Sequence, residues 1–166
     1  MKTINMIQKI VSGGQTGADL AALITAKKFD IKTGGFAPKG WKTESGSNPY
    51  LCTRYNLVET SSEDYKERTE KNVLTTDATI IFYDTYSKGS YLTKITCEKK
   101  KKPYLLISSS KWDEEKEFMM AKFIFEIYLK KKRPIFINFS GNRESKSPGI
   151  EQRVINILEN LFNKSI

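Results

Sequence analysis

Short, mostly apolar runs alternate along this chain with longer segments in which apolar positions recur every three or four residues. The short runs are rich in β-branched and aromatic residues and predict strands at 6–11, 33–36, 55–58, 78–83, 103–107 and 134–139. The longer segments predict helices at 18–28, 61–75, 90–100, 110–129 and 147–162. Strands that alternate with helices form a mostly parallel sheet with helices on both faces. The pattern therefore predicts a three-layer α/β fold, and the length fits a single domain over residues 1–166.

Three of the predicted helices carry recognisable start sequences. Thr60-Ser61-Ser62-Glu63 and Ser110-Lys111-Trp112-Asp113 have the spacing of a capping box. Ser147-Pro148 places a polar N-cap before a proline at the first helical position. The polar segment 37–56 predicts a long loop with room for a small hairpin, and loops of this length often have a function.

Glycines cluster where the first strand meets the first helix, in Ser12-Gly13-Gly14-Gln15-Thr16-Gly17-Ala18-Asp19. Glycine tolerates positive φ and leaves no Cβ in the way of a ligand. The first amides of a helix lack intrahelical acceptors and the helix dipole adds positive charge, so an anion, most often phosphate, is the expected occupant. The alternative is a turn that only makes a sharp corner. The candidate ligand contacts in this loop are Gly13, Gly14, Gln15, Thr16, Gly17 and Asp19.

Further candidates follow from the topology, because ligands of such sheets bind beyond the carboxyl ends of the strands, where strand order reverses. The segments that follow the predicted strands are rich in Gly, Ser, Lys and Arg, whereas the strands themselves are apolar. From these segments and from the helix after Thr60, the candidate contacts are Lys39, Gly40, Arg68, Asn72, Gly89, Ser90, Arg143, Glu144 and Ser145.

Several candidates also have a purely structural interpretation. Trp41 either stacks on a flat heterocycle or plugs the loop from below. Arg68 either reaches the ligand or pairs on the helix surface with Glu63, Asp64 or Glu67.

The same choice applies farther along the chain. Arg143 either binds phosphate through its planar fork or pairs with Glu144. Ser90 either faces an anion or only caps its helix. Asp77 and Asp84 flank the strand at 78–83 with no partner visible in the sequence, and we expect no metal site there.

The net charge of +9 is concentrated in two basic runs, 99–102 and 130–133. Both runs end predicted helices, where the dipole favours cations, and no base-reading module accompanies them. We therefore expect a small anionic ligand as the partner, and neither nucleic acid nor a membrane. Histidine is absent, which excludes Ser-His-Asp and Cys-His catalysis and imidazole metal ligands. Two unrelated cysteines, Cys52 and Cys97, and the lack of a signal peptide favour the cytoplasm.

Six short motifs, taken in chain order, resemble those of a known family. They are Ser12–Asp19, Pro38–Gly40, Leu57–Thr60, Arg68–Val73, Asp77–Thr79 and Gly141–Ile150. Together they resemble the molybdenum carrier, or molybdenum-cofactor carrier, proteins within the Rossmann-like group of SLOG and lysine-decarboxylase-like proteins. The resemblance implies a Rossmann-like fold, frequent homo-oligomers, and molybdenum cofactor or a nucleotide-type ligand at the strand ends. The chain departs from the family pattern at Lys88, where the family usually has glycine, and at Asn142, where it usually has proline.

These observations lead to an expected function. We expect a non-catalytic carrier for a phosphate-bearing anionic cofactor, in the first place molybdenum cofactor or molybdate. The amides of residues 13–17 would hold the phosphate, and Lys39, Arg68 and Arg143 would supply charge. One alternative is a protein that binds, senses or sequesters a nucleotide-derived, ADP-ribose-type ligand. Another is a nucleotide or glycosidic hydrolase with Glu44 or Glu144 as acid–base group, but the glycine-rich helix start of such enzymes is missing.

Overall fold

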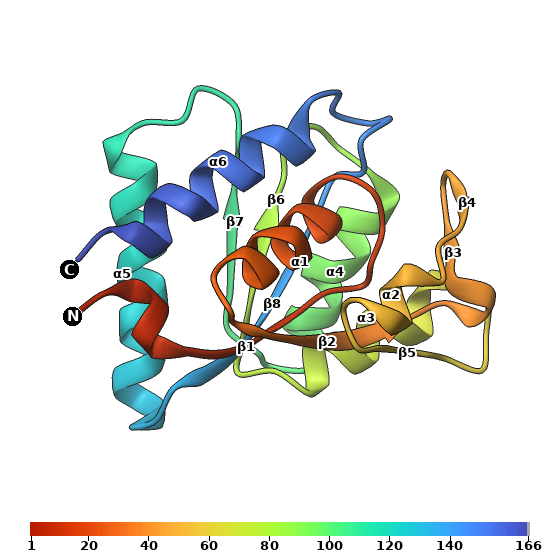
Figure 1. Cartoon of the computed structure of the whole chain (residues 1–166), viewed down its shortest axis with the longest axis horizontal. Helices are drawn as coiled ribbons and strands as arrows, with labels where there is room; N and C mark the ends of the chain where they lie inside the picture. Colours follow the sequence, from red (N-terminus) through yellow and green to blue (C-terminus); the bar gives the residue numbers. More distant parts are fainter. Residues whose placement is uncertain (166) are drawn as a thin grey trace.

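The computed structural model describes residues 1–165 and contains a six-stranded, entirely parallel sheet (Figure 1). The strand order is β5-β2-β1-β8-β6-β7. The strands are β1 (Ile7–Val11), β2 (Lys32–Ala37), β5 (Leu57–Glu59), β6 (Ala78–Phe82), β7 (Tyr104–Ile107) and β8 (Ile135–Gly141). The chain adds β2 and β5 on one side of β1, then crosses over and adds β6 and β7, and finally inserts β8 between β1 and β6. Strand order thus reverses beside β1, and the α/β prediction is confirmed.

Helices cover both faces of the sheet. The α1 (Ala18–Lys28), α5 (Glu114–Lys131) and α6 (Ile150–Asn163) helices bury apolar side chains in the main hydrophobic core, with the short η1 (Thr3–Met6) beside α5 and α6. The α3 (Tyr65–Leu74) and α4 (Lys88–Lys99) helices pack against each other behind the sheet in the view of Figure 1. Within residues 1–165 no helix combines the length and apolar character needed to cross a membrane.

The interface between the sheet and the α3–α4 pair is unusually polar. The buried Asn138 amide donates to Thr79 Oγ1 at 3.3 Å, and the hydroxyls of Thr93 and Ser140 lie 3.2 Å apart. Hydroxyl and amide groups in a core need internal partners, and these groups satisfy one another. The consequence is a polar lining beneath α3 and α4, in contrast to the apolar core on the opposite face.

The long segment between β2 and β5 is partly ordered into short elements. It contains η2 (Lys39–Trp41), the antiparallel hairpin of β3 (Lys42–Thr43) and β4 (Gly46–Ser47), and α2 (Tyr50–Thr53). The small hairpin is confirmed, whereas α2 falls in a stretch predicted as loop. Trp41 packs on a second apolar cluster that includes Leu51 and Leu57. Its side chain therefore fills the space beneath the loop, which is the structural alternative given for it above.

The predicted helix starts at 60–63 and 110–113 are displaced in the structure. The cap of α3 is Asp64, which accepts from the Lys66 amide at 3.0 Å, and the cap of α5 is Asp113, which accepts from the Lys116 amide at 2.9 Å. In both cases an aspartate immediately before the first helical residue takes the role assigned to an earlier Thr or Ser. Likewise α4 begins two residues before Ser90, capped by Ser87.

The predicted N-cap at Ser147 is also wrong. The α6 helix begins at Ile150, and Gly149 occupies the cap position in a left-handed conformation. A side chain from the preceding loop satisfies its first amides, as described below.

The two basic runs lie at the carboxyl ends of α4 and α5, as predicted. Lys102 Nζ donates to the carbonyl of Thr76 at 2.9 Å. Arg133 and Lys131 form ion pairs with Asp77 at 2.9 and 3.3 Å. The runs precede β7 and β8 and therefore lie at the edge of the sheet opposite the glycine-rich loop.

Candidate functional site

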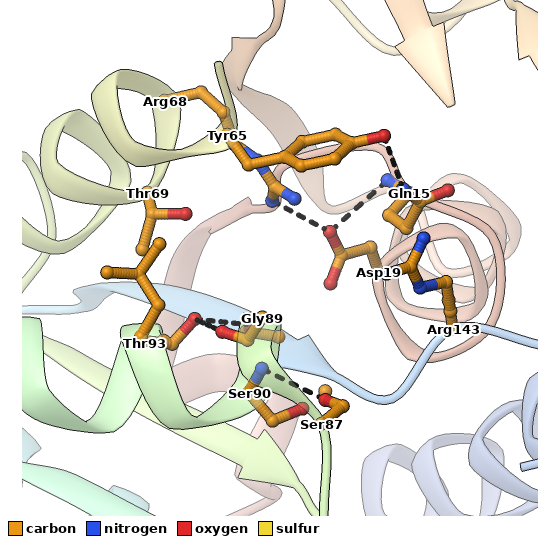
Figure 2. A pocket seen from close by; sticks show the side chains of 13 residues that line it. Gln15, Asp19, Tyr65, Arg68, Thr69, Ser87, Gly89, Ser90, Thr93 and Arg143 are labelled. Atoms are coloured by element: carbon orange, nitrogen blue, oxygen red, sulfur yellow. Dashed lines mark hydrogen bonds and ion pairs between the residues drawn. The ribbon is translucent and has the colours of Figure 1, made fainter. Parts of the chain in front are cut away.

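A small polar pocket opens at the carboxyl edge of the sheet, beside the point where strand order reverses (Figure 2). Its volume is about 40 Å³, which is room for a few waters or one small polar group. The walls come from the β1–α1 loop, the first turns of α3 and α4, and the end of β8. The lining residues are Gln15, Asp19, Tyr65, Arg68, Thr69, Ser87, Gly89, Ser90, Leu92, Thr93, Ser140, Gly141 and Arg143.

A buried ion pair forms the centre of this pocket. Arg68 Nη1 lies 3.2 Å from Asp19 Oδ2, with the two side chains only 12% and 2% exposed. The guanidinium also lies over the ring of Tyr65, 5.2 Å from its centroid, and the buried Arg68 Nε has no protein partner. Burial raises the pKa of Asp19, an effect that the nearby Arg68 charge only partly offsets. Arg68 thus pairs with none of the neighbouring acids on its own helix.

The glycine-loop amides that the sequence offers to a phosphate are largely engaged within the chain. The Gln15 amide, and also that of Gly13, donates to the Asp19 carboxylate. The Gly14 amide donates to Ser12 Oγ, and that of Thr16 to the Gln15 side chain. The next two amides are taken by α6 and by the β8–α6 loop: Gly17 donates to Glu151 and Ala18 to the Asn142 carbonyl.

The glycines of this loop make room for protein side chains. A Cβ on Gly13 would overlap the guanidinium of Arg68, so this glycine is what lets Arg68 reach Asp19. Gly14 has a φ of +77° and faces Leu51 and Leu57 of the second apolar cluster. Both glycines therefore have structural roles.

The start of α6 is filled by the chain's own carboxylate. Glu144 accepts hydrogen bonds from the amides of Gly149 and Glu151, the latter at 3.1 Å. These are the first amides of α6, so Glu144 occupies the position that an anionic ligand would take at this helix start. Glu144 does not line the pocket.

A strap formed by the β3–β4 hairpin adjoins the pocket wall. Glu44 at the hairpin tip accepts from the hydroxyls of Thr16 and Ser145 and from the Ser145 amide, and lies 3.8 Å from Arg143 Nε. Burial alone would raise the pKa of Glu44, but hydrogen bonds from Ser145 and Thr16 lower it. The hairpin thereby holds the loop that carries Arg143.

The start of α4 remains open to a ligand. Ser87 caps the helix by accepting from the Ser90 amide at 3.1 Å. The amides of Lys88 and Gly89 precede the first intrahelical hydrogen bond and have no acceptor in the helix. This end of α4 carries partial positive charge and faces the same pocket as Arg68 and Arg143.

The structure brings together only part of the predicted site. Gln15, Asp19, Arg68, Gly89, Ser90 and Arg143 line the pocket, while Gly13 and Asn72 line a narrow void behind it. Asn72 is held there by a pair of hydrogen bonds with the Phe36 backbone, at 2.8 and 3.1 Å. The predicted residues that line neither space are Gly14, Thr16, Gly17, Lys39, Gly40, Glu144 and Ser145.

Several lining residues were not among the predicted contacts. Thr93 lies one turn after Ser90, so helical spacing from Ser90 identifies it. Ser140 is a polar residue at the end of an apolar strand, which marks it as a residue of the carboxyl edge. For Ser87 and Leu92, neither helical spacing from a predicted contact nor a position at a strand end indicates a place in the pocket wall.

Asn142 and Asp84 hold the pocket rim in place. Asn142 Oδ1 accepts from the amides of Asp84 and Thr85, while its Nδ2 donates to the Thr85 carbonyl and to Ser87 Oγ. Asp84 accepts from the amide and hydroxyl of Ser109, from Ser147 and from Arg153. Burial alone would raise the pKa of Asp84, but hydrogen bonds from Ser109, Arg153 and Ser147 lower it to about 2.

We predict that Gly13→Ala destabilises the protein by about 2–4 kcal/mol, because the new Cβ displaces Arg68 and leaves Asp19 buried without its partner. The matched control is Gly89→Ala, where a Cβ meets nothing within 4 Å, and this change should be neutral or stabilising by up to about 1 kcal/mol. Urea denaturation measures both. Equal effects of the two substitutions would contradict the role assigned to Gly13.

We predict that the Asp84 network stabilises the fold above pH 4 and is lost in acid. The pKa of Asp84 falls from 3.8 to about 2 on folding, so its ionised form favours the folded state until the pH approaches 2. The difference in unfolding free energy between the parent and Asp84→Asn should shrink by about 2 kcal/mol between pH 6 and pH 2. Asp30→Asn is the control, and a pH-independent Asp84→Asn difference would refute the prediction.

Comparison with known proteins places this fold in a family. A family model described as the circularly permutated YpsA SLOG family matches residues 10–162. A crystal structure named "Putative molybdenum carrier protein", from Syntrophus aciditrophicus SB, is similar with a TM-score of 0.85 and 38% sequence identity, over 96% of this chain and 97% of that one. No functionally curated protein matches the chain significantly. The chain belongs to the circularly permutated YpsA family of SLOG proteins.

Proposed function

We propose that this protein is a non-catalytic carrier that binds an anionic cofactor through an oxyanion group in the pocket beside β1 and β8. The cofactor proposed first is molybdenum cofactor, with its phosphate or a molybdate group in the pocket. The observation that supports the proposal is the convergence of Arg68, Arg143 and the open start of α4 on one small polar space. The name of the similar crystal structure supports the choice of molybdenum.

The chemistry of the lining favours an oxyanion. The hydroxyl-bearing residues Tyr65, Thr69, Ser87, Ser90, Thr93 and Ser140 line the same pocket as Arg68 and Arg143. Arg68 Nη1 is held by Asp19, and the buried Arg68 Nε has no acceptor among the described residues. Each charge-assisted hydrogen bond to such a group contributes about 1.5–3 kcal/mol, so three or more would give the roughly −8 kcal/mol of micromolar binding.

The size of the pocket indicates how the ligand would lie. A volume of about 40 Å³ would admit one phosphate- or molybdate-sized group and leave a pterin or nucleoside outside, at the mouth. Tyr65 is the aromatic side chain of the pocket wall, since Trp41 packs in the second apolar cluster. Within residues 1–165 no three His, Cys, Asp or Glu side chains form a possible metal cluster, so molybdenum would be held through its own oxygen ligands.

The alternative ligand is a nucleotide-derived molecule of the ADP-ribose type, whose phosphate would occupy the same pocket. Hydrolysis has less support, because Glu44 and Glu144 have hydrogen-bond donors within the chain and neither lines the pocket. We further propose that the protein acts in the cytoplasm as a homo-oligomer. The free thiols of Cys52 and Cys97 support a reducing compartment.

We predict that Arg68→Ala and Arg143→Ala each weaken anion binding at least tenfold, because each removes one charge-assisted contact. The matched control is Arg54→Ala, which removes a guanidinium that stacks on Tyr50 outside the pocket and should leave the affinity unchanged. Isothermal titration with molybdate, phosphate, AMP, ADP-ribose and molybdenum cofactor measures the affinities and ranks the two ligand classes. Absence of binding for all five, or an equal loss with Arg54→Ala, would overturn the proposal.

A further inference from the structure

The strongest hydrogen-bond acceptor in the wall of the pocket is engaged within the chain. The carboxylate of Asp19 accepts from the Gly13 amide, and its Oδ2 accepts from the Gln15 amide and from Arg68 Nη1, both at 3.2 Å. The Asp19 side chain is only 2% exposed. A ligand group that donates a hydrogen bond therefore finds this carboxylate already occupied.

The side-chain amide of Gln15 is fixed in one orientation. Its Oε1 accepts from the backbone amides of Thr16 and Glu44, at 3.0 and 2.9 Å. A carboxamide oxygen has two lone pairs, so these two donors use both of them. Nε2 points the other way and donates to the Tyr65 hydroxyl at 3.3 Å (Figure 2). Gln15 therefore offers the pocket its remaining N–H donor and no acceptor.

Ser87 has the same pattern at the start of α4. Its Oγ accepts from the Ser90 amide at 3.1 Å and from Asn142 Nδ2 at 3.2 Å, so its O–H is the part left for a ligand. The other hydroxyls of the wall rotate and serve as donor or acceptor. The two guanidinium groups, of Arg68 and Arg143, have donors alone. The polar groups that cannot change their role thus leave donors for a ligand.

The β3–β4 hairpin maintains this arrangement. Its tip contributes the Glu44 amide that holds Gln15 Oε1, and the Glu44 carboxylate accepts from the hydroxyls of Thr16 and Ser145. These contacts attach the hairpin tip to the β1–α1 loop and to the β8–α6 loop. The hairpin therefore opposes the half-turn of the Gln15 carboxamide that would present its oxygen to a ligand.

We infer that the pocket selects a fully ionised oxyanion, with no proton on the oxygens that enter it, and that Gln15 determines this selectivity. The inference rests on the proposed function, because it takes the occupant to be an oxyanion. An unprotonated oxygen accepts from Arg68, Arg143 and Gln15 Nε2, whereas a protonated one brings a donor to a wall whose fixed acceptors are engaged. Molybdate and the dianion of a phosphate monoester meet this requirement, and the monoanion of the same ester does not.

The first test compares phenyl phosphate with phenyl sulfate on the full chain at pH 5. A phosphate monoester has a second pKa of about 6 and is mostly a protonated monoanion at this pH, whereas phenyl sulfate is an unprotonated monoanion of similar shape. Calorimetric titration in two buffers of different ionisation enthalpy gives the number of protons released on binding. Because only the dianion enters, phenyl phosphate should release about one proton more than phenyl sulfate.

The outcomes separate this inference from the proposed function. Phenyl sulfate reports any proton exchanged by the titratable groups that face the pocket, which are Asp19, Tyr65, Arg68 and Arg143. Equal proton release for the two esters would show that the protonated phosphate binds, and would overturn the selectivity while the binding of an oxyanion still held. Failure of both esters to bind would overturn the proposed function and the selectivity with it.

The second test is Gln15→Glu, whose carboxylate still accepts from the Thr16 and Glu44 amides but turns its other oxygen toward the pocket. That oxygen accepts from a protonated phosphate, so proton release with phenyl phosphate at pH 5 should fall by about one proton from the parent value. Affinity for phenyl sulfate at pH 8 should fall at least tenfold through charge repulsion. Gln8→Glu, at an exposed position of β1, is the matched control and should keep the parent values. Unchanged proton release in Gln15→Glu would overturn the role of Gln15.

Discussion

The buried ion pair between Asp19 and Arg68 is the interaction on which the candidate site depends. It joins the start of α1 to α3 across the carboxyl edge of the sheet, and Gly13 leaves the space through which the guanidinium passes. Removing two charges from water is costly, and such a pair is retained only where hydrogen bonds compensate. Here the loop amides bind the carboxylate, whereas Arg68 Nε is left without a partner. The pair therefore fixes the shape of the glycine-rich loop, and the guanidinium retains one buried N–H without an acceptor.

The same structure shows why a helix start is an anion site only when the chain does not fill it. Asp19 takes amides at the start of α1, and Glu144 takes those at the start of α6. At α4 the cap is the neutral hydroxyl of Ser87, so the partial charge of the dipole remains available. Under the proposed function, the anion would therefore bind in the space between Arg68, Arg143 and α4, and not on the glycine-rich loop that the sequence favours. Asn138, Thr93 and Ser140 form a polar layer beneath α3 and α4. This layer continues the polar lining of the pocket into the interior of the fold.

Local patterns in the sequence are sufficient for the architecture. The α1 helix has the bounds that its periodicity predicts, and the parallel sheet follows from the alternation of strands and helices. What the sequence cannot supply are pairings between distant segments. The partner of Arg68 is Asp19, far away in the chain, although four acids lie within five residues of Arg68. The carboxylate of Glu144 is equally plausible as a ligand contact or a cap until the position of α6 is known. Helix caps fail for a different reason, because several Ser, Thr and Asp residues compete within a few positions and tertiary contacts select one of them.

The most direct test of the account is the position of the anion itself. Crystals grown with molybdate would locate the metal through its anomalous scattering. The account predicts a peak between the guanidinium groups of Arg68 and Arg143 and the first turn of α4, with Asp19 still bound to the Gln15 amide. A peak on the amides of residues 13–17, with Asp19 displaced from them, would contradict it, as would molybdenum bound solely at the lysine-rich opposite edge of the sheet.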